Sequence, residues 1–464
     1  MNLVEKRSLK FVAAASGGEL RTNRPDLAVE NICTDSKQAK TGDLFVAIRG
    51  ERFDGHDFVN DVVAKNVTGI LIERKKAPKP LPACPVVLVE DSRVALGKIA
   101  AAYRAEFQLP VFAVAGSNGK TTTKELVASV FKQKYLTLAS EASFNNDIGV
   151  PATLMRLTKE HQAAVVEAGT NHPGELAALI RIIQPKFGIL TNIGREHLEF
   201  FGDLAGVAKE EGWLAELLPA DGTLFLNNDN EWCDKIAKRT KGTVVRVGFG
   251  EKNDWRARSV RLDKGGVTFQ VEAPEAEYNG EYRINLLGRH QVLNALFAIA
   301  AGAAIGVSRA EIVRGLAECQ PPKMRMQYWE ANGVRVLDDA YNANTDSVRA
   351  ALETLCDLPL QGRRVAILGD MAELGAQSGA AHMEVGRYVA ELKIGQLFTV
   401  GPMAAATAKA AREAGLTRVI EFADVEAAVR AVKNFLKPGD VVLLKASRSS
   451  RLERIAETLK SGKN

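Results

Sequence analysis

Val111-Phe-Ala-Val-Ala-Gly-Ser-Asn-Gly-Lys-Thr-Thr-Thr123 is the stretch from which the fold of this chain can be worked out. Its first five residues form an apolar run after Pro110, long enough for one central strand. Gly116 and Gly119 allow a tight turn that brings backbone N–H groups close to a phosphate. A helix expected after the turn directs its positive end at the same anion. The stretch therefore predicts a strand, a phosphate-binding turn and a helix.

The spacing of this turn differs from that of the common P-loop. The common pattern, G-x-x-x-x-G-K-[ST], requires a glycine where this chain has Val114. The chain instead carries the shorter form Gly116-x-x-Gly119-Lys120-Thr121. In such a turn Lys120 can reach the outer phosphates of a nucleotide, and the Thr121 hydroxyl can bind a magnesium ion. The alternative is an ordinary strand-to-helix turn with a solvated lysine.

The composition indicates a globular protein of several domains. A chain of 464 residues exceeds one ordinary domain and predicts two to four. Its 46% hydrophobic and 25% charged residues are ordinary values for folded proteins. The net charge of +5 is mild, so we expect anionic ligands but no nucleic acid as a partner. No run approaches the roughly 18 apolar residues of a membrane helix, and we expect no membrane span.

Cysteine usage and the first residues indicate a cytoplasmic protein. The five cysteines are scattered and form no C-x-x-C pair, so we expect reduced thiols and no zinc site. Residues 1–10 are charged and lack an apolar centre, so we expect no signal peptide. Both features predict a cytoplasmic location.

Three regions follow one another along the chain and together predict an α/β protein. Residues 1–107 contain short strands and turns and predict a small N-terminal α/β domain, which ends before the helix-interrupting Pro110. Residues 108–317 alternate strands with helices, which predicts a central doubly wound sheet of the P-loop type. Residues 318–464 alternate again without a G-x-G-x-x-G, which predicts a smaller Rossmann-like domain that binds no dinucleotide.

Two polar residues are expected at the edge of the central sheet where ligands bind. Glu167 stands near the carboxyl end of a buried strand predicted over residues 163–169, where a carboxylate is costly unless it is paired or binds a metal. His197 follows the strand predicted over residues 187–193 and shares this edge with Glu167 and Lys120. A structural histidine and a ligand or catalytic group both remain open for His197.

Two other polar segments offer ligand-binding groups. Thr34, Ser36 and Lys37 share a turn with hydroxyl and cationic donors suited to a phosphate, although a capped surface turn explains the same residues. The loop 143–151 carries Asn145 and Asn146 and is too rich in amides to belong to the core.

Several stretches, spread in order from residue 34 onward, resemble the Mur ligase family, the ATP-dependent amide-bond ligases of bacterial cell-wall synthesis. They are Thr34-Asp-Ser36 with Gly42-Asp-Leu-Phe-Val-Ala-Ile48 and Phe53-Asp-Gly-His56, Gly116-Ser-Asn-Gly-Lys-Thr-Thr122, Asn145-Asn-Asp-Ile-Gly-Val-Pro151, Thr191-Asn-Ile-Gly194 with His197-Leu-Glu199, Gly288-Arg-His-Gln-Val-Leu-Asn294, Asp338-Asp-Ala-Tyr-Asn-Ala-Asn344, and Ile367-Leu-Gly-Asp-Met-Ala-Glu-Leu-Gly375 with His382. The glycine turn marks only the superfamily, whereas residues 338–344 and 367–375 are more specific.

The resemblance implies an activity and its partners. Several stretches are similar to the member that joins D-alanyl-D-alanine to UDP-N-acetylmuramoyl-tripeptide through an acyl phosphate, with ATP and magnesium, to form the pentapeptide precursor of peptidoglycan. The first domain would then bind the UDP substrate, the second ATP, and the third would serve the dipeptide side. We expect a monomer whose partners are UDP-MurNAc-tripeptide and D-Ala-D-Ala. Whether the tripeptide ends in lysine or diaminopimelate stays open.

The same resemblance assigns roles to individual residues. ATP would be held by Gly116, Ser117, Asn118, Gly119, Lys120, Thr121, Thr122, His290, Asn294, Arg325, Asp339 and Asn342. The UDP group would be bound by Ser36 and Lys37, and the sugar-peptide by Asn145 and Asn146. Magnesium ligands would be Thr121, Glu167, His197 and Glu211, and the catalytic set Lys120, Glu167, His197 and Glu211.

One position departs from the pattern of the family. Most members carry, after the histidine, a lysine that becomes a carbamate and supports the second magnesium ion. In the branch that this chain resembles, it is the second of two lysines placed two positions apart. In Val207-Ala-Lys-Glu-Glu-Gly-Trp213 the first place is taken by Lys209 and the second by Glu211. Our hypothesis is that the Glu211 carboxylate replaces the carbamate; the alternative is a solvated helix face.

Other functions also remain open. The chain could be another amide ligase of the Mur or folylpolyglutamate type, or a P-loop nucleotide switch that makes no bond. A switch would have no use for residues 338–344 and 369–375, which argues against it. A phosphate-binding scaffold without catalysis remains an alternative if Glu211 does not function.

Overall fold

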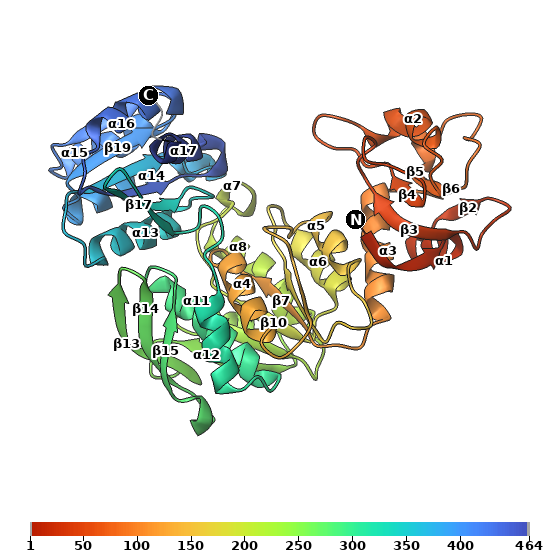
Figure 1. Ribbon diagram of the computed structural model, residues 1–464, viewed down its shortest axis with the longest axis horizontal. Coiled ribbons are helices and arrows are strands. Elements are labelled where there is room, and N and C mark those ends of the chain that lie inside the picture. Colours follow the sequence, from red (N-terminus) through yellow and green to blue (C-terminus); the bar gives the residue numbers. More distant parts are fainter. Residues whose placement is uncertain (1, 462–464) are drawn as a thin grey trace.

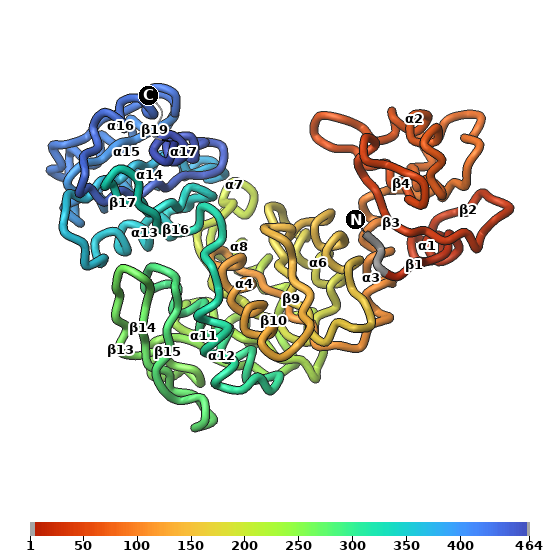
Figure 2. Tube along the Cα trace, in the orientation of Figure 1, coloured from red at the N-terminus to blue at the C-terminus, as the bar shows by residue number. Residues whose placement is uncertain are grey.

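The computed structural model describes residues 2–461, and three sheets succeed one another along the chain (Figure 1). The part with the central sheet lies between the other two, as the path of the chain in Figure 2 shows. The α/β architecture in three parts, expected from the sequence, is confirmed. Residues 1 and 462–464, at the outer ends of the first and third predicted domains, lie outside the described residues.

The first part is a six-stranded sheet in the order β1-β3-β4-β5-β6-β2, in which β1 and β2 are antiparallel to their neighbours. Its elements are β1 (Asn2–Ser8), α1 (Leu9–Ser16), β2 (Glu19–Arg21), β3 (Ala28–Cys33), β4 (Asp43–Val46), α2 (Val59–Val63), β5 (Gly69–Glu73), β6 (Val86–Val89) and α3 (Ser92–Ala105). Helix α3 leaves this sheet and packs on α5 and α6 of the next part. The buried Arg104 of α3 donates to the Ile183 carbonyl at 3.2 Å, which ties the two parts together.

The central sheet has nine strands in the order β15-β14-β13-β12-β11-β10-β7-β9-β8. Its elements are β7 (Val111–Ala115), α4 (Lys120–Phe131), β8 (Thr137–Ala139), α5 (Gly149–Leu154), β9 (Ala163–Glu167), α6 (Glu175–Ile183), β10 (Phe187–Leu190), α7 (Leu198–Phe201), α8 (Leu204–Glu211), α9 (Trp213–Glu216), β11 (Thr223–Asn227), α10 (Cys233–Ala237), β12 (Thr243–Gly248), β13 (Trp255–Asp263), β14 (Gly266–Glu272), β15 (Gly280–Ile284), α11 (His290–Ala304) and α12 (Arg309–Glu318). Strand β7 lies between β10 and β9, so the glycine turn leaves the sheet beside the ends of both neighbours.

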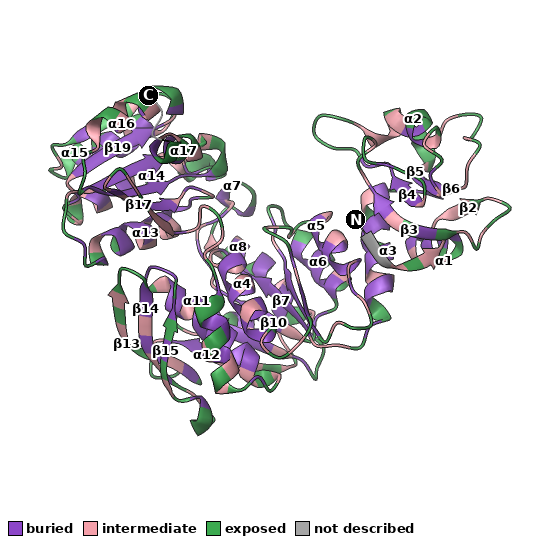
Figure 3. Cartoon of the chain, in the orientation of Figure 1, coloured by how far each residue is buried: buried purple, intermediate pink, exposed green. Residues whose placement is uncertain are grey.

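Strand β7 is apolar throughout because helices cover both faces of the sheet here. All five of its residues are buried (Figure 3). On one face Phe112 stacks on Phe187 of β10, with ring centroids 4.3 Å apart and planes 8° from parallel. Helix α4 adds Phe131 to the same cluster, edge-on to Phe112 at 4.9 Å. This packing holds the start of α4 rigidly against the sheet edge.

The strand–helix alternation expected over the central region stops at β13. Strands β13, β14 and β15 pair antiparallel and extend the parallel sheet at one edge, where Figure 1 shows them as green arrows. The reason is a change of hydrophobic period. In β14, buried Val267, Phe269 and Val271 alternate with Thr268 and Gln270, which are less buried. Alternation with a period of two favours a strand with one covered face and disfavours a helix.

The third part is a six-stranded sheet in the order β16-β17-β21-β18-β19-β20, parallel except for the edge strand β16. Its elements are β16 (Gln327–Ala331), β17 (Val334–Asp339), α13 (Thr345–Asp357), β18 (Arg364–Gly369), α14 (Ser378–Glu391), β19 (Gln396–Val400), α15 (Ala404–Glu413), β20 (Val419–Phe422), α16 (Val425–Phe435), β21 (Val441–Lys445) and α17 (Glu453–Ser461). The alternation of strands and helices predicted for this region is confirmed. Across the described part of the chain, every helix is too short or too polar to traverse a lipid bilayer.

Candidate active site

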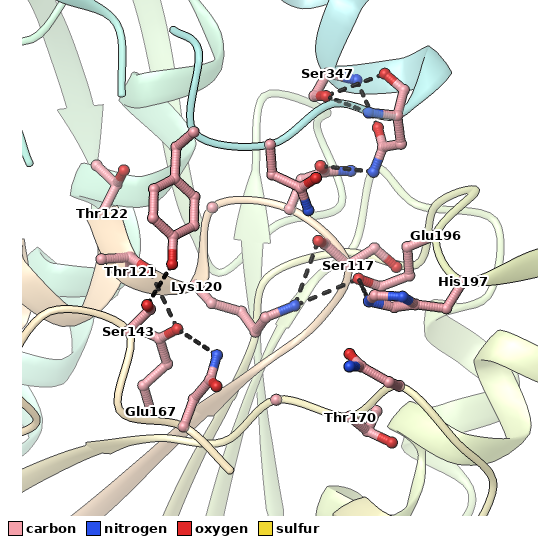
Figure 4. A pocket seen from close by; sticks show the side chains of 18 of the residues that line it. Ser117, Lys120, Thr121, Thr122, Ser143, Glu167, Thr170, Glu196, His197 and Ser347 are labelled. Atoms are coloured by element: carbon pink, nitrogen blue, oxygen red, sulfur yellow. Dashed lines mark hydrogen bonds and ion pairs between the residues drawn. The ribbon is translucent and has the colours of Figure 1, made fainter. Parts of the chain in front are cut away.

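A cavity of about 780 Å³ opens where the three parts of the chain meet. Glu51 and Arg93 of the first part line it, together with the glycine turn of the second and Asn342 and Lys445 of the third. Figure 4 shows the side chains that converge around the turn. A hollow of this size, bounded by all three parts, can hold a ligand much larger than a single phosphate.

The glycine turn has the geometry of an anion-binding loop. Gly116 and Gly119 have φ values of 115° and 84°, which lie in the region that favours glycine. A Cβ on Gly119 would lie 2.6 Å from Asn294 Oδ1, and one on Gly116 would collide with the Thr191 hydroxyl. Among the described residues no side chain caps α4, whose first N–H groups therefore remain available to a phosphate.

Lys120 folds back over the turn that carries it. Its ammonium donates to the Gly116 carbonyl at 2.5 Å and lies 3.4 Å from the Glu196 carboxylate. Burial alone would lower the Lys120 pKa, but the carboxylates of Glu196, Glu211 and Glu167 outweigh burial and raise it. Lys120 is therefore a fixed positive charge at the mouth of the phosphate-binding turn.

Glu167 and Thr121 meet as the sequence predicts. Thr121 donates its hydroxyl hydrogen to Glu167 Oε1 at 3.1 Å, and Asn145 donates to the same oxygen at 2.9 Å. Glu167 is only 1% exposed, and its Oε2 has no hydrogen-bond partner in the described part of the chain. An ionised carboxylate oxygen buried without a partner is costly unless a cation completes it. These residues fit a magnesium ion, which prefers oxygen ligands.

His197 lies at the same edge as expected, and the third part of the chain holds it in place. It immediately precedes α7 and has a φ of 47°, and its Nδ1 forms a short hydrogen bond with Glu373. Its Nε2 lies 3.8 Å from Glu196 Oε2. The two ring nitrogens therefore face different carboxylates, Glu196 from the second part of the chain and Glu373 from the third.

Glu211 is buried, whereas Lys209 on the same helix is exposed. Glu211 is 1% exposed, and neither of its carboxylate oxygens has a hydrogen-bond partner within residues 2–461. Burial, and next the negative charge of Glu196, raise the Glu211 pKa well above its usual range. The solvated helix face considered from the sequence is therefore wrong for Glu211.

The remaining residues predicted to bind ATP line the cavity from two sides. His290, Asn294 and the neighbouring Gln291 approach from α11. Loss of hydration lowers the His290 pKa, so its ring is neutral at pH 7 and can accept a hydrogen bond. Buried Asn294 accepts from the Thr123 hydroxyl at 3.1 Å, which anchors α11 to α4.

The third part contributes Arg325, Asp339 and Asn342 on the facing wall of the cavity. The Arg325 guanidinium lies over the Tyr341 ring, 4.1 Å from its centroid. Asp339 Oδ2 pairs with the Lys445 ammonium at 2.6 Å, and the same ammonium donates to the Asn342 carbonyl at 2.7 Å. The three predicted residues therefore belong to one connected wall.

Polar contacts between the second and third parts were not found from the sequence. Arg195 donates to Asp346 and to Glu384, each at 2.7 Å. Asn344 donates to Asn118 Oδ1 at 2.9 Å. Nothing in the sequence position of Arg195 indicates that its partners come from residues far along the chain.

Asn145 and Asn146 line the cavity, whereas Ser36 and Lys37 do not belong to its described lining. Ser36 and Lys37 lie in the turn of the first part, where Asp35 Oδ1 accepts from the Lys37 N–H at 2.9 Å. The Lys65 ammonium donates to the Ser36 carbonyl at 2.7 Å. The capped turn considered from the sequence is thus present, and the predicted UDP contact stays a prediction.

Three family models match successive parts of the chain. They are "Mur ligase family, catalytic domain" over residues 28–104, "Mur ligase middle domain" over residues 114–302 and "Mur ligase, glutamate ligase domain" over residues 324–448. The UDP-N-acetylmuramoyl-tripeptide--D-alanyl-D-alanine ligase of Escherichia coli (strain K12) is 36% identical over 94% of this chain and 94% of its own length. The chain belongs to the Mur ligase family.

Solved structures share the whole architecture of this Mur ligase. A crystal structure of MurF from Acinetobacter baumannii is 33% identical and has a TM-score of 0.91, covering 98% of this chain and 99% of its own. The MurF ligase of Thermotoga maritima, solved in complex with ADP, is 27% identical with a TM-score of 0.83, covering 93% and 97%. The similarity to this branch of the Mur ligases, expected from the motifs, is confirmed.

Proposed function

We propose that this chain is the ATP-dependent ligase that joins D-alanyl-D-alanine to UDP-N-acetylmuramoyl-tripeptide. The observation that carries the proposal is the single cavity in which the glycine turn, with Lys120, faces Arg325 and Asn342 of the third part. An enzyme that activates one substrate with ATP and then admits a second needs such a site between parts that can close. The near full-length similarity to ligases of this name supports the choice of substrates.

The reaction has two steps, and both concentrate negative charge beside the glycine turn. The tripeptide carboxylate attacks the γ-phosphorus of ATP, and ADP leaves as an acyl phosphate forms. The dipeptide amine then attacks the acyl carbon, loses a proton and expels phosphate, which leaves an amide bond. Lys120 and the free N–H groups at the start of α4 stabilise this charge, and no protein nucleophile is required.

Magnesium ions fit two places at this site. Thr121 and Glu167 would hold one, and His197 and Glu211 would help to hold the other. Bound there, the ions would neutralise charge on the phosphates of ATP. The buried carboxylate oxygens without partners on Glu167 and Glu211 support both assignments among the residues that the structure describes.

The other predicted contacts complete the proposal. Asn145 and Asn146 orient the sugar-peptide, while Ser36 and Lys37 hold the UDP group. His290 and Asn294 serve the adenine side, and Arg325, Asp339 and Asn342 approach ATP from the third part. We place the enzyme in the cytoplasm, where its nucleotide substrates occur, and expect it to act as a monomer.

Phosphate release with purified protein tests the function. We expect release from ATP and UDP-MurNAc-tripeptide only when D-Ala-D-Ala is also present, with one amide bond formed for each phosphate. Parallel reactions with a single D-amino acid or with a folate and glutamate test the related ligase types. Phosphate release that ignores the dipeptide, or that requires one of these other substrates, would contradict the proposal.

Glu211→Gln tests whether this carboxylate replaces the carbamate. The amide keeps the volume but loses the charge, so we expect activity at limiting magnesium to fall by about 10–100-fold. Higher magnesium should restore part of the loss. Lys209→Ala, on the exposed side of the same helix, is the matched control and should behave as the unmodified protein. Unchanged rate and magnesium requirement in Glu211→Gln would refute the replacement.

A further inference from the structure

Glu196 is a buried carboxylate at the edge of the cavity to which the sequence assigned no role. It is 6% exposed and precedes His197 at the end of the loop that follows β10. Its Oε2 lies 3.4 Å from the Lys120 ammonium, whereas its Oε1 is buried without a partner among residues 2–461. In Figure 4, Lys120 lies between Glu167 on one side and Glu196 and His197 on the other.

The carboxylates around Lys120 outnumber the positive charges. Glu196, Glu211 and Glu167 all act on the single Lys120 ammonium. The guanidinium of Arg195, the residue before Glu196, is paired with Asp346 and Glu384 of the third part. Three carboxyl groups therefore surround one ammonium, and a divalent cation among them would favour their ionised form. Buried excess charge is unfavourable without a counter-ion.

The buried carboxylate oxygens without hydrogen-bond partners also indicate a cation. Besides Glu167 Oε2, three carboxylate oxygens in this cluster are buried and lack partners in the described chain: Glu196 Oε1 and both oxygens of Glu211. Each of the two side chains is more than nine-tenths buried. Native structures seldom leave such oxygens without a partner. Carboxylate oxygens are ligands that hard divalent cations prefer.

His197 is held in the orientation that a shared site would need. Its Nδ1 is occupied by Glu373, which leaves Nε2 directed toward Glu196 Oε2 at 3.8 Å. A carboxylate on the far nitrogen of a histidine is the usual arrangement behind a metal-binding imidazole. Glu373 belongs to the third part, so the arrangement exists only while the second and third parts are together.

We propose that Glu196 is a further ligand of the divalent cation held by Glu211 and His197. This proposal rests on the proposed function, since the cation is the second ion of the ligase site. Within residues 2–461, no three histidine, cysteine, aspartate or glutamate side chains are placed so that they could hold a metal ion by themselves. We therefore expect the site to be completed by phosphate oxygens, and the cation to bind there tightly only when a nucleotide is present.

Manganese binding measured by electron paramagnetic resonance tests the assignment without relying on catalysis. The full chain is titrated with Mn²⁺ in the presence of saturating β,γ-imido-ATP, which is not hydrolysed. We expect the unmodified protein to bind two Mn²⁺ ions tightly, the first at Thr121 and Glu167 and the second at Glu211 and His197. In Glu196→Gln the second should weaken by about 10–100-fold while the first is retained. Glu199→Gln, an exposed carboxylate three positions along the chain, should bind both ions normally.

Thermal unfolding in metal-free buffer separates this role from a merely structural one. Removing one charge from an over-charged cluster should leave the Tm of Glu196→Gln unchanged or higher. A structural partner of Lys120 would instead lower the Tm and leave Mn²⁺ binding intact. That result, or normal binding of the second ion by Glu196→Gln, would overturn the proposal.

The outcome is distinguishable from failure of the proposed function. Dipeptide-dependent phosphate release by the unmodified protein tests the reaction, whereas the Mn²⁺ titration tests Glu196 alone. If the unmodified enzyme is active and Glu196→Gln binds the second ion normally, only the assignment of Glu196 as a ligand is refuted. Phosphate release that does not depend on the dipeptide refutes the proposed function, whichever ions are bound.

Discussion

Lys120→Ala will lower kcat/KM for dipeptide-dependent phosphate release by about 10³-fold, the loss typical of removing a charge that stabilises a transition state. The Lys120 ammonium belongs to the turn that is proposed to hold the phosphates, and it donates to the Gly116 carbonyl at 2.5 Å. Both chemical steps build charge at this point. The loss should therefore appear in kcat as well as in KM.

The substitution also removes the counter-charge of Glu196, Glu211 and Glu167, so the Tm should fall in metal-free buffer. Activity is accordingly measured well below the Tm, with folding checked by circular dichroism. Lys132→Ala, at the exposed end of the same helix, is the matched control and should retain full activity. A folded Lys120→Ala enzyme with less than about a tenfold loss would contradict the assigned role.

Glu167→Gln is expected to cause the second largest loss, about 10²–10³-fold in kcat, with a higher magnesium concentration needed for half-maximal rate. The amide can still accept from the Thr121 hydroxyl and from Asn145, so the local packing should survive. The change removes the negative charge on Oε2, the oxygen without a partner among the described residues. The fall in activity should therefore reflect lost magnesium binding rather than unfolding.

A magnesium titration of phosphate release, combined with the Tm, checks this prediction. Glu160→Gln, in the exposed loop before β9, is the matched control and should leave both quantities unchanged. If Glu167→Gln kept the magnesium dependence of the unmodified enzyme and lost only stability, Glu167 would be a structural carboxylate that pairs with Thr121.

Much of the fold could be predicted because hydrophobic period and turn residues are local properties. The strand predicted at residues 111–115 matches β7, and the helix predicted after the glycine turn matches α4. The antiparallel extension β13–β15 was not predicted. Residues 266–272 alternate apolar and polar side chains after the glycines at 265 and 266. This pattern predicts an antiparallel strand, but the surrounding alternation of strands and helices hides it.

The candidate site was predictable where chain order brings strand ends together. Lys120 and His197 follow parallel strands of the central sheet, Glu167 is the last residue of another, and parallel strands in one sheet end at the same edge. The role proposed for Glu196 could not be predicted, because a glutamate beside a histidine is ordinary in a sequence and only its burial distinguishes it. Its 6% exposure and its unpartnered oxygen are properties of the folded, described chain.

The phosphate-binding turn, the class of each domain and the family of this protein are properties of its residue order, because glycine spacing and hydrophobic period act over a few neighbouring residues. The charge balance around Lys120 is different. Whether Glu211 faces water or a buried acid cluster depends on which elements pack around α8, and the sequence left both open. Likewise, Glu373 reaches His197 across 176 positions only because two separate sheets come together. Long-range packing sets burial, and burial decides which carboxylates need a cation.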